Sequence, residues 1–128
     1  MHFAAEGSRD LGMFTVPIQI GDLAGQNFLN LDVLVDTGST YTVLPKNALD
    51  QIGIEQQGQR SFELADDRLV EYPIGYARMR LGDDQTIVLV VFGPEGISPL
   101  LGATALEHLS LTVDPVHQKL VPVHALLK

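Results

Sequence analysis

The sequence contains no cysteine among its 128 residues. Disulfide bonds, zinc sites with thiolate ligands and cysteine nucleophiles are therefore excluded. The redox compartment stays open, although a chain without cysteine is compatible with the cytosol. A chain of this length is sufficient for one domain with a single hydrophobic core and is too short for two domains.

Basic residues are scarce, since 8 lysines and arginines stand against 16 aspartates and glutamates and leave a net charge of -8 at pH 7. A surface of this sign repels nucleic-acid phosphates and anionic lipid headgroups, so we expect no nucleic-acid partner. Apolar residues still make up 45% of the chain, which is enough to offset the entropic cost of ordering most of it.

Long apolar runs are also missing, because none approaches the roughly 20 residues with which a helix crosses a bilayer. The N-terminal segment carries Glu6, Arg9 and Asp10 in place of the apolar centre of a signal peptide. We expect residues 1–12 to be a flexible lead-in. The expected location is the cytoplasm, without a membrane partner, unless the chain is a fragment of a longer, membrane-anchored parent.

Several catalytic signatures are absent as well: the sequence has no Gly-x-Ser-x-Gly, no Walker loop and no Gly-x-Gly-x-x-Gly, so serine hydrolases and nucleotide-binding proteins lack support. No two histidines have His-x-x-x-His spacing, and the paired aspartates lie between expected strands, where Asp serves as a turn residue. We therefore expect surface histidines, turn aspartates, no metal site and no cofactor. These residues are His2, His108, His117 and His124, and the pairs Asp66-Asp67 and Asp83-Asp84.

The pattern that is present is strand-like. Alternating apolar and polar residues predict β-strands at 14–20 and 28–35. Pro17 has no N–H, so the first strand lies at a sheet edge or turns this position outward. Residues 62–81 read as a long hairpin, and a change in the phase of their alternation indicates a β-bulge near Gly75.

The remaining segments complete an all-β pattern. Residues 87–92 are apolar throughout, which is typical of a central strand buried on both faces. Pro45 opens a predicted helix over 45–52, and Thr104 and Glu107 have the capping-box spacing that starts a second short helix. A closing hairpin follows at 111–123. The fold class is therefore all-β, a barrel or sandwich of about seven strands with one or two short helices.

One loop indicates chemistry. Asp36-Thr37-Gly38-Ser39 directly follows an apolar strand and places a carboxylate on a tight turn between hydroxyl side chains. An isolated Asp-Thr-Gly is most often an ordinary Asx turn. Here two apolar residues precede Asp36, and Leu100-Leu101-Gly102 repeats the apolar-apolar-Gly element before the second helix. This context favours a functional loop.

Together these motifs resemble the retropepsin-like aspartic proteases, the single-domain relatives of pepsin and of the retroviral proteases. The resemblance runs from about Met13 to Val123 and implies a closed acid-protease-like β-barrel, one domain over 13–128, with Asp36 as the catalytic residue and residues 62–76 as a flap hairpin. It further implies that Leu100-Leu101-Gly102 is a second structural element of the lobe. Segments 43–45, 64–66 and 111–115 belong to the same resemblance.

The chemistry of peptide hydrolysis gives an independent argument. Without a metal or a nucleophilic side chain, one group must take a proton from water and another must give one to the carbonyl oxygen. Two carboxylates about 3 Å apart do both, because like-charge repulsion keeps one protonated while the other is ionised. The chain has a single Asp-Thr-Gly, so a symmetric homodimer with two copies of Asp36 is expected.

The neighbours of Asp36 have expected roles. The resemblance implies that Thr37 ties the two active-site loops together through hydroxyl-to-backbone bonds, and that Gly38 lets backbone N–H groups approach the carboxylates. Ser39 stands where retroviral enzymes usually have alanine and is similar to the pepsin pattern. Its hydroxyl is expected to donate to the Asp36 carboxylate, which favours the ionised form and gives an acidic optimum.

The expected partner is a peptide or protein substrate, bound as an extended strand between the flap and the floor of the cleft. Apolar candidates in the cleft indicate hydrophobic side chains beside the cleaved bond. The polar flap tip predicts incomplete closure and weak activity. The alternative interpretation is a non-catalytic dimerisation or peptide-binding module. The flap and cleft candidates are Val43, Leu64, Ala65, Asp66, Tyr72 and Ile74.

Overall fold

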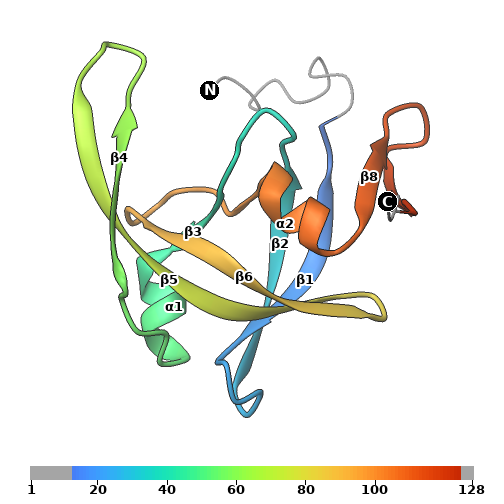
Figure 1. Cartoon of the computed structure of the whole chain (residues 1–128), viewed down its shortest axis with the longest axis horizontal. Coiled ribbons are helices and arrows are strands. Elements are labelled where there is room, and N and C mark those ends of the chain that lie inside the picture. The colour runs from blue at the N-terminus through green and yellow to red at the C-terminus, as the bar shows by residue number, and fades with distance from the viewer. Residues whose placement is uncertain (1–12, 125–128) are drawn as a thin grey trace, which may run out of the picture.

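The computed structural model describes residues 13–124, and Figure 1 shows that strands dominate them. The predicted all-β fold class with two short helices is confirmed. The predicted lead-in at 1–12 lies outside the described residues. The strands are β1 Thr15–Gly21, β2 Phe28–Val35, β3 Thr42–Pro45, β4 Gly58–Glu63, β5 Leu69–Leu81, β6 Asp84–Gly93, β7 Leu100–Leu101, β8 Leu111–Asp114 and β9 Lys119–Pro122, and the helices are α1 Lys46–Gln51 and α2 Ala103–His108.

The main sheet closes on itself. Its strand order is β1-β2-β7-β3-β6-β5-β4, and β1 also pairs with β5. The ring therefore consists of β1, β2, β7, β3, β6 and β5. β4 lies outside this ring and pairs with β5. β8 and β9 form a separate antiparallel hairpin, as predicted for the end of the chain. This ring of strands agrees with the acid-protease-like fold that the sequence predicts.

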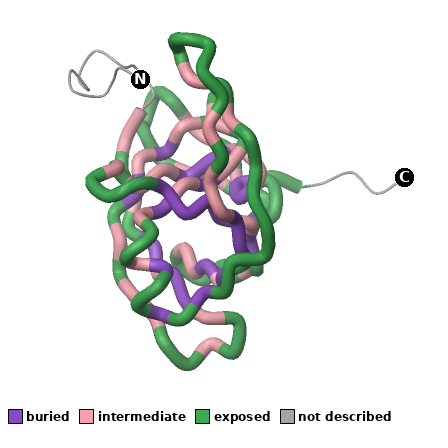
Figure 2. The backbone as a smooth tube through the Cα atoms, turned by 90° about the vertical axis from the view of Figure 1, so that its left-hand side faces the viewer, coloured by how far each residue is buried: buried purple, intermediate pink, exposed green. Residues whose placement is uncertain are grey.

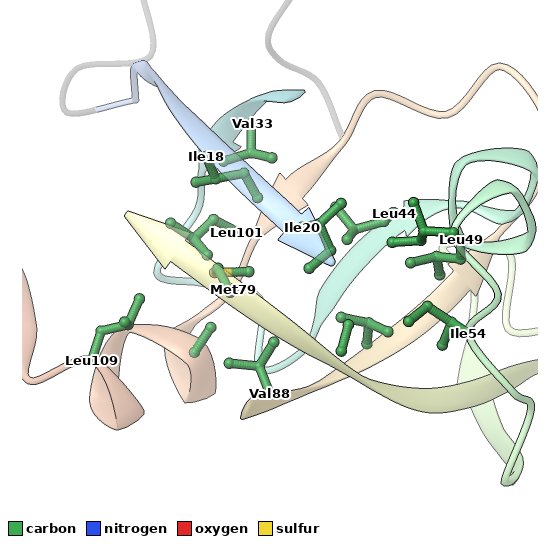
Figure 3. Close-up of a cluster of buried hydrophobic side chains, with 14 of the residues drawn as sticks. Ile18, Ile20, Val33, Leu44, Leu49, Ile54, Met79, Val88, Leu101 and Leu109 are labelled. Carbon is green, nitrogen blue, oxygen red and sulfur yellow. The ribbon is translucent and has the colours of Figure 1, made fainter. Parts of the chain in front are cut away.

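The core fills the inside of the ring (Figure 3). Ile20, Val33, Leu44 and Met79 come from four different strands and are 0% exposed. Their burial follows from the period of two, which sends every second side chain of a strand to the same face. α1 adds Leu49 to the same cluster. Within residues 13–124, no helix is long and apolar enough to span a membrane.

The alternation predicts β1 and β2 well, and the continuous apolar run predicts β6. Pro17 pairs with Asp32 of β2, and β5 joins the other side of β1 only from Gln19 onward, so the missing N–H of Pro17 lies where β1 has one neighbour. β6 is central, with β3 on one side and β5 on the other, and its residues Val90–Gly93 are all buried. β1 is therefore not an edge strand, because it pairs with both β2 and β5, and Pro17 lies on the part of it that has one neighbour. The expected central position of β6 is confirmed, but Ile87 is exposed, so the expected burial on both faces does not hold along the whole segment.

The predicted β-bulge near Gly75 is wrong. β5 pairs one-to-one with β6 from Ile74 opposite Val91 to Leu81 opposite Asp84, without an extra residue. Ile74 is instead the position where β5 ends its pairing with β4 and begins its pairing with β6. A side chain at Gly75 would begin 2.5 Å from the carbonyl oxygen of Glu55. The phase therefore changes where β5 exchanges β4 for β6 as its partner and where Gly75 packs against the backbone of Glu55.

The second helix is predicted correctly, but its predicted cap is wrong. α2 begins at Ala103 with Gly102 as the N-cap residue and has no side-chain cap, so Thr104 and Glu107 do not form a capping box. The backbone N–H groups of Ala103 and Thr104 donate instead to the carbonyl oxygens of Ser39, at 2.7 Å, and Thr40, at 3.1 Å. The loop after β2 therefore satisfies the free N–H groups at the start of α2.

Candidate active site

Asp36 is the first residue after β2, and the backbone leading to it is held on both sides. The N–H of Asp36 donates to the carbonyl oxygen of Leu101 at 3.0 Å, and the N–H of Val35 donates to that of Phe14 at 2.8 Å. β7 lies parallel to β2, with Leu101 opposite Val35. The element Leu100-Leu101-Gly102 thus lies beside the Asp36 loop and fixes where it leaves the sheet.

The loop turns tightly around the Asp36 side chain. The N–H of Gly38 donates to Asp36 Oδ1 at 2.9 Å, and the N–H of Ser39 donates to the Asp36 carbonyl oxygen at 3.1 Å. The first bond is the expected approach of a backbone N–H to the carboxylate. Asp36 is half-buried, whereas Thr37 and Gly38 are exposed. The carboxylate is therefore held from below and remains accessible from one side.

Ser39 does not act as the sequence predicts. Its hydroxyl donates to the carbonyl oxygen of Tyr41 at 2.8 Å, so the expected donation to the Asp36 carboxylate is replaced by a bond within the loop backbone. The Asp36 carboxylate and the Tyr41 carbonyl oxygen both belong to residues near Ser39 in the sequence. The course of the loop brings the Tyr41 carbonyl oxygen to the hydroxyl. Ser39 therefore supports the loop rather than the charge of Asp36.

Gly102 joins this loop to α2. Its N–H donates to the hydroxyl oxygen of Thr42 at 3.0 Å, and Thr42 is only 1% exposed. A side chain on Gly102 would begin 2.8 Å from the carbonyl oxygen of Ser39 and closer still to that of Tyr41. Only glycine fits this space. The sequence analysis missed Thr42, whose one signal was a hydroxyl residue within an apolar strand.

A pocket of about 450 Å³ opens beside the carboxylate. Asp36 and Thr37 form one wall, and Thr112, Val113 and Pro115 from the β8–β9 hairpin form another. The sequence carries no sign that the C-terminal hairpin lies beside Asp36, because the two segments are far apart along the chain and share no motif.

The β4–β5 hairpin projects from the ring of strands, and its tip is exposed (Figures 1 and 2). The tip closes through the N–H of Leu64, which donates to the Arg68 carbonyl oxygen at 2.8 Å. Asp66 and Arg68 form an exposed ion pair of 2.7 Å across the tip. The predicted polar tip is therefore present, with Asp66 paired to Arg68 and Asp67 leaving one negative charge at the surface.

The predicted substrate-binding residues fall into different environments. Leu64, Tyr72 and Val43 are half-buried, and Ala65 and Asp66 are exposed at the tip of the hairpin. Ile74 is only 5% exposed. Its side chain is covered within the single chain, and its place in the cleft stays a prediction.

The histidines are on the surface, as predicted for the three that lie in the described part of the chain. His2 lies outside it. His117 has a partner that the sequence analysis missed, since its Nδ1 is 2.8 Å from Asp114 Oδ2 three residues earlier. This hydrogen bond is the main reason why the pKa of Asp114 lies below its usual range. Residues 13–124 contain no cluster of three or more potential metal ligands from His, Asp and Glu.

Comparison with known proteins supports the fold and the family. The crystal structure of Lpg0085, a protein of unknown function (DUF785) from Legionella pneumophila, is similar, with a TM-score of 0.52 and 18% sequence identity over 86% of this chain and 93% of that chain. At this identity, the similarity supports the fold alone. No curated protein matches the chain.

A family model described as "gag-polyprotein putative aspartyl protease" matches residues 21–108. The matched segment begins at the end of β1, ends with α2 and includes the whole Asp36 loop and the projecting hairpin. It covers more than half of the chain, and the resemblance to retropepsin-like proteins is thereby confirmed. This protein belongs to the gag-polyprotein aspartyl protease family.

Proposed function

We propose that this protein is an aspartic endopeptidase that works as a symmetric homodimer. The observation that carries the proposal is the hydrogen bond of 2.9 Å from the Gly38 N–H to Asp36 Oδ1, on a loop anchored by β7 and α2. This bond holds a half-buried carboxylate in one orientation beside an open pocket. A fixed and accessible carboxylate is what general acid–base catalysis requires.

The mechanism needs a second carboxylate, because one group cannot accept a proton and donate another at the same moment. Two Asp36 side chains about 3 Å apart share one proton and hold a water between them. The ionised carboxylate takes a proton as the water attacks the carbonyl carbon, and the protonated one gives its proton to the carbonyl oxygen. When the C–N bond breaks, the carboxyl group that is now protonated gives its proton to the leaving amine, and the other carboxylate takes a proton from a hydroxyl of the diol, so the pair again shares one proton.

A twofold axis beside Asp36 supplies the second carboxylate. The side of the loop that carries Thr37 is exposed, so two copies can approach there. The Thr37 hydroxyls then bond across the axis to the partner loop, as in the family that the chain resembles. We expect an acidic optimum, because a doubly ionised pair has lost its acid.

The β4–β5 hairpin serves in this proposal as a flap that covers an extended peptide. The half-buried Leu64 and Val43 supply apolar contacts, which favours hydrophobic side chains next to the cleaved bond. The net charge of -8 favours peptides over nucleic acids as partners. We propose no cofactor and no metal, since the two carboxylates supply both proton transfers.

One observation favours a second candidate, a dimerisation or peptide-binding module without useful proteolysis. The flap tip is polar and is closed by the exposed pair of Asp66 and Arg68, so it provides little apolar surface for excluding water. A module of this kind binds a peptide in the groove without cleaving it at a useful rate.

The test is cleavage of an unfolded protein from about pH 3 to about pH 8, at a concentration where sedimentation shows a dimer. Asp36→Asn retains the shape and removes the shared proton, whereas Asp32→Asn changes an exposed carboxylate on β2, the strand that leads to Asp36, and serves as the control. We expect acid-dependent cleavage by the wild type and Asp32→Asn, and none by Asp36→Asn. A confirmed dimer without cleavage at any pH supports the binding module instead.

A further inference from the structure

Three aromatic rings connect the catalytic loop with both strands of the flap. The rings of Tyr41 and Phe62 meet edge to face, with centroids 5.8 Å apart and planes at 84°. The rings of Phe62 and Tyr72 are 5.9 Å apart and tilted by 48°. Both distances lie in the range where aromatic pairs attract each other. We call Tyr41, Phe62 and Tyr72 the aromatic tie.

One end of the aromatic tie is rigid. Tyr41 follows the catalytic loop, and its carbonyl oxygen accepts the Ser39 hydroxyl at 2.8 Å while lying against Gly102. The next residue, Thr42, is buried and accepts the Gly102 N–H at 3.0 Å. The backbone that carries the Tyr41 ring is therefore fixed to the same elements that fix Asp36.

The other end belongs to the flap, the least supported part of the sheet. Within the described residues, β4 pairs with β5 and with no other strand. Along β4 every residue is exposed except Phe62, which is half-buried. Phe62 is thus the side chain through which β4 contacts the catalytic loop, and Figure 2 shows the exposed hairpin rising above the buried part of the chain.

We propose that the aromatic tie sets the position of the flap over Asp36, with Tyr41 and Phe62 as positioning residues for substrate binding. This inference deepens the proposed function and rests on it for its kinetic part. When the flap moves away to admit a peptide, the contact between Tyr41 and Phe62 opens, and when it closes, the contact forms again. The tie therefore determines what fraction of the molecules has a closed flap before substrate arrives.

Loss of the aromatic tie is expected to affect KM and kcat differently. A flap that is open more often binds substrate less tightly, because part of the binding free energy is used to close it. Once the flap has closed, the geometry around Asp36 is unchanged. Loss of the tie therefore raises KM and leaves kcat nearly unchanged.

The first test measures amide hydrogen exchange in the full-length protein and needs no proteolysis. In Phe62→Leu and in Tyr41→Leu, we expect the β4–β5 amides to exchange about two- to tenfold faster, the range that follows from the strength of one aromatic pair. The double variant is expected to exchange no faster than Phe62→Leu, because Phe62→Leu already removes the contact that Tyr41→Leu removes. Tyr76→Leu removes an exposed aromatic side chain from β5 outside the tie and is the control.

Two results overturn the proposal. Flap exchange that stays at the wild-type rate in both single variants means that the rings do not hold the flap. An equal acceleration in the flap and in β1–β2 means that the rings support general stability instead. Acceleration confined to β4 and β5, with Tyr76→Leu unchanged, supports the tie.

The second test measures kcat and KM for peptide cleavage. Phe62→Leu is expected to raise KM by about the same two- to tenfold factor, and Phe62→Tyr, which retains the ring, is expected to restore it. A fall in kcat with unchanged KM contradicts the positioning role. If the wild type cleaves nothing, the proposed function fails, and the exchange test still decides the aromatic tie.

Discussion

The N–H of Ala103 donates to the carbonyl oxygen of Ser39 at 2.7 Å, so the first turn of α2 is capped by the loop that carries Asp36. This bond joins the loop after β2 to the helix after β7, and the strands β3 to β7 lie between these two segments in the sequence. It makes the position of the catalytic loop depend on α2, and the start of α2 depend on the loop. Gly102, which precedes Ala103 and lies against the carbonyl oxygen of Ser39, is consequently expected to be sensitive to substitution.

Gly102→Ala is predicted to damage both stability and activity. The added methyl group would lie against the carbonyl oxygens of Ser39 and Tyr41, and the backbone must move to accept it. Overpacking of this kind costs about 1–3 kcal/mol. Urea denaturation measures the loss of stability, and cleavage of an unfolded protein measures the displacement of Asp36. A variant with wild-type stability and activity would contradict the close packing of the loop on α2.

Thr104→Ala is predicted to be nearly neutral. Its hydroxyl makes no cap at the start of α2, and its N–H bond to Thr40 involves only the backbone, which alanine retains. The free energy of unfolding is therefore expected to change by less than about 0.5 kcal/mol. If Thr104 were a true capping residue, urea denaturation would show a loss of about 1 kcal/mol. The same variant is the control for Gly102→Ala.

The capping error illustrates what the sequence can predict. The strands β1, β2 and β6 are predictable because alternation or continuous apolarity reflects burial within the segment itself. The start of α2 is decided by carbonyl groups of a distant loop, and the phase change in β5 is decided by the carbonyl of Glu55 against Gly75. Neither contact leaves a local pattern in the residues that it affects.

The same distinction applies to the site. The hydrogen bond from the Gly38 N–H to Asp36 Oδ1 joins residues two positions apart, so it is predictable from Asp-Thr-Gly alone. The acceptor of the Ser39 hydroxyl depends on the path of the loop, which no local pattern of residues shows. The short strands β3 and β7 have too few residues to show a period, although β7 fixes the backbone of Asp36.

Ser39→Ala is predicted to leave the pH profile of cleavage unchanged. The hydroxyl donates to the Tyr41 carbonyl oxygen, so its removal takes no hydrogen bond from the Asp36 carboxylate. The expected cost is a loss of about 0.5–1.5 kcal/mol in stability from the missing loop bond. The measurement is kcat/KM as a function of pH, together with urea denaturation. A shift of the optimum toward neutral pH would show that the hydroxyl supports the ionised carboxylate after all.

The β8–β9 turn is predicted to be sensitive to acid. The hydrogen bond from the His117 side chain, followed by that from the His117 N–H, lowers the pKa of Asp114 below its usual range. A carboxyl group whose pKa is lowered by folding stabilises the folded state above its unfolded pKa, and this contribution disappears as the pH falls through the lowered value. The turn is therefore expected to loosen only below the ordinary titration range of aspartate.

NMR titration of the Asp114 side-chain carboxyl carbon measures this effect. In His117→Ala the side-chain hydrogen bond, which is the main cause of the lowered pKa, is gone. The pKa of Asp114 is therefore expected to rise toward its usual value. In Asp114→Asn the acid sensitivity of the turn is expected to vanish. An unchanged Asp114 titration in His117→Ala would show that the exposed pair does not form in solution.

Mixing wild-type protein with Asp36→Asn is predicted to suppress cleavage beyond simple dilution. If the active site contains one Asp36 from each chain, an equal mixture that exchanges subunits freely leaves about a quarter of the dimers with two carboxylates. Total activity then falls to about half of that expected when wild-type chains pair only with wild-type chains. Asp32→Asn, which alters an exposed residue of β2, is expected to form fully active mixed dimers. Activity that simply follows the amount of wild-type chain, in a mixture where subunit exchange is demonstrated, would contradict a shared site. The result bears directly on the one feature a single chain does not contain, the second carboxylate opposite Asp36.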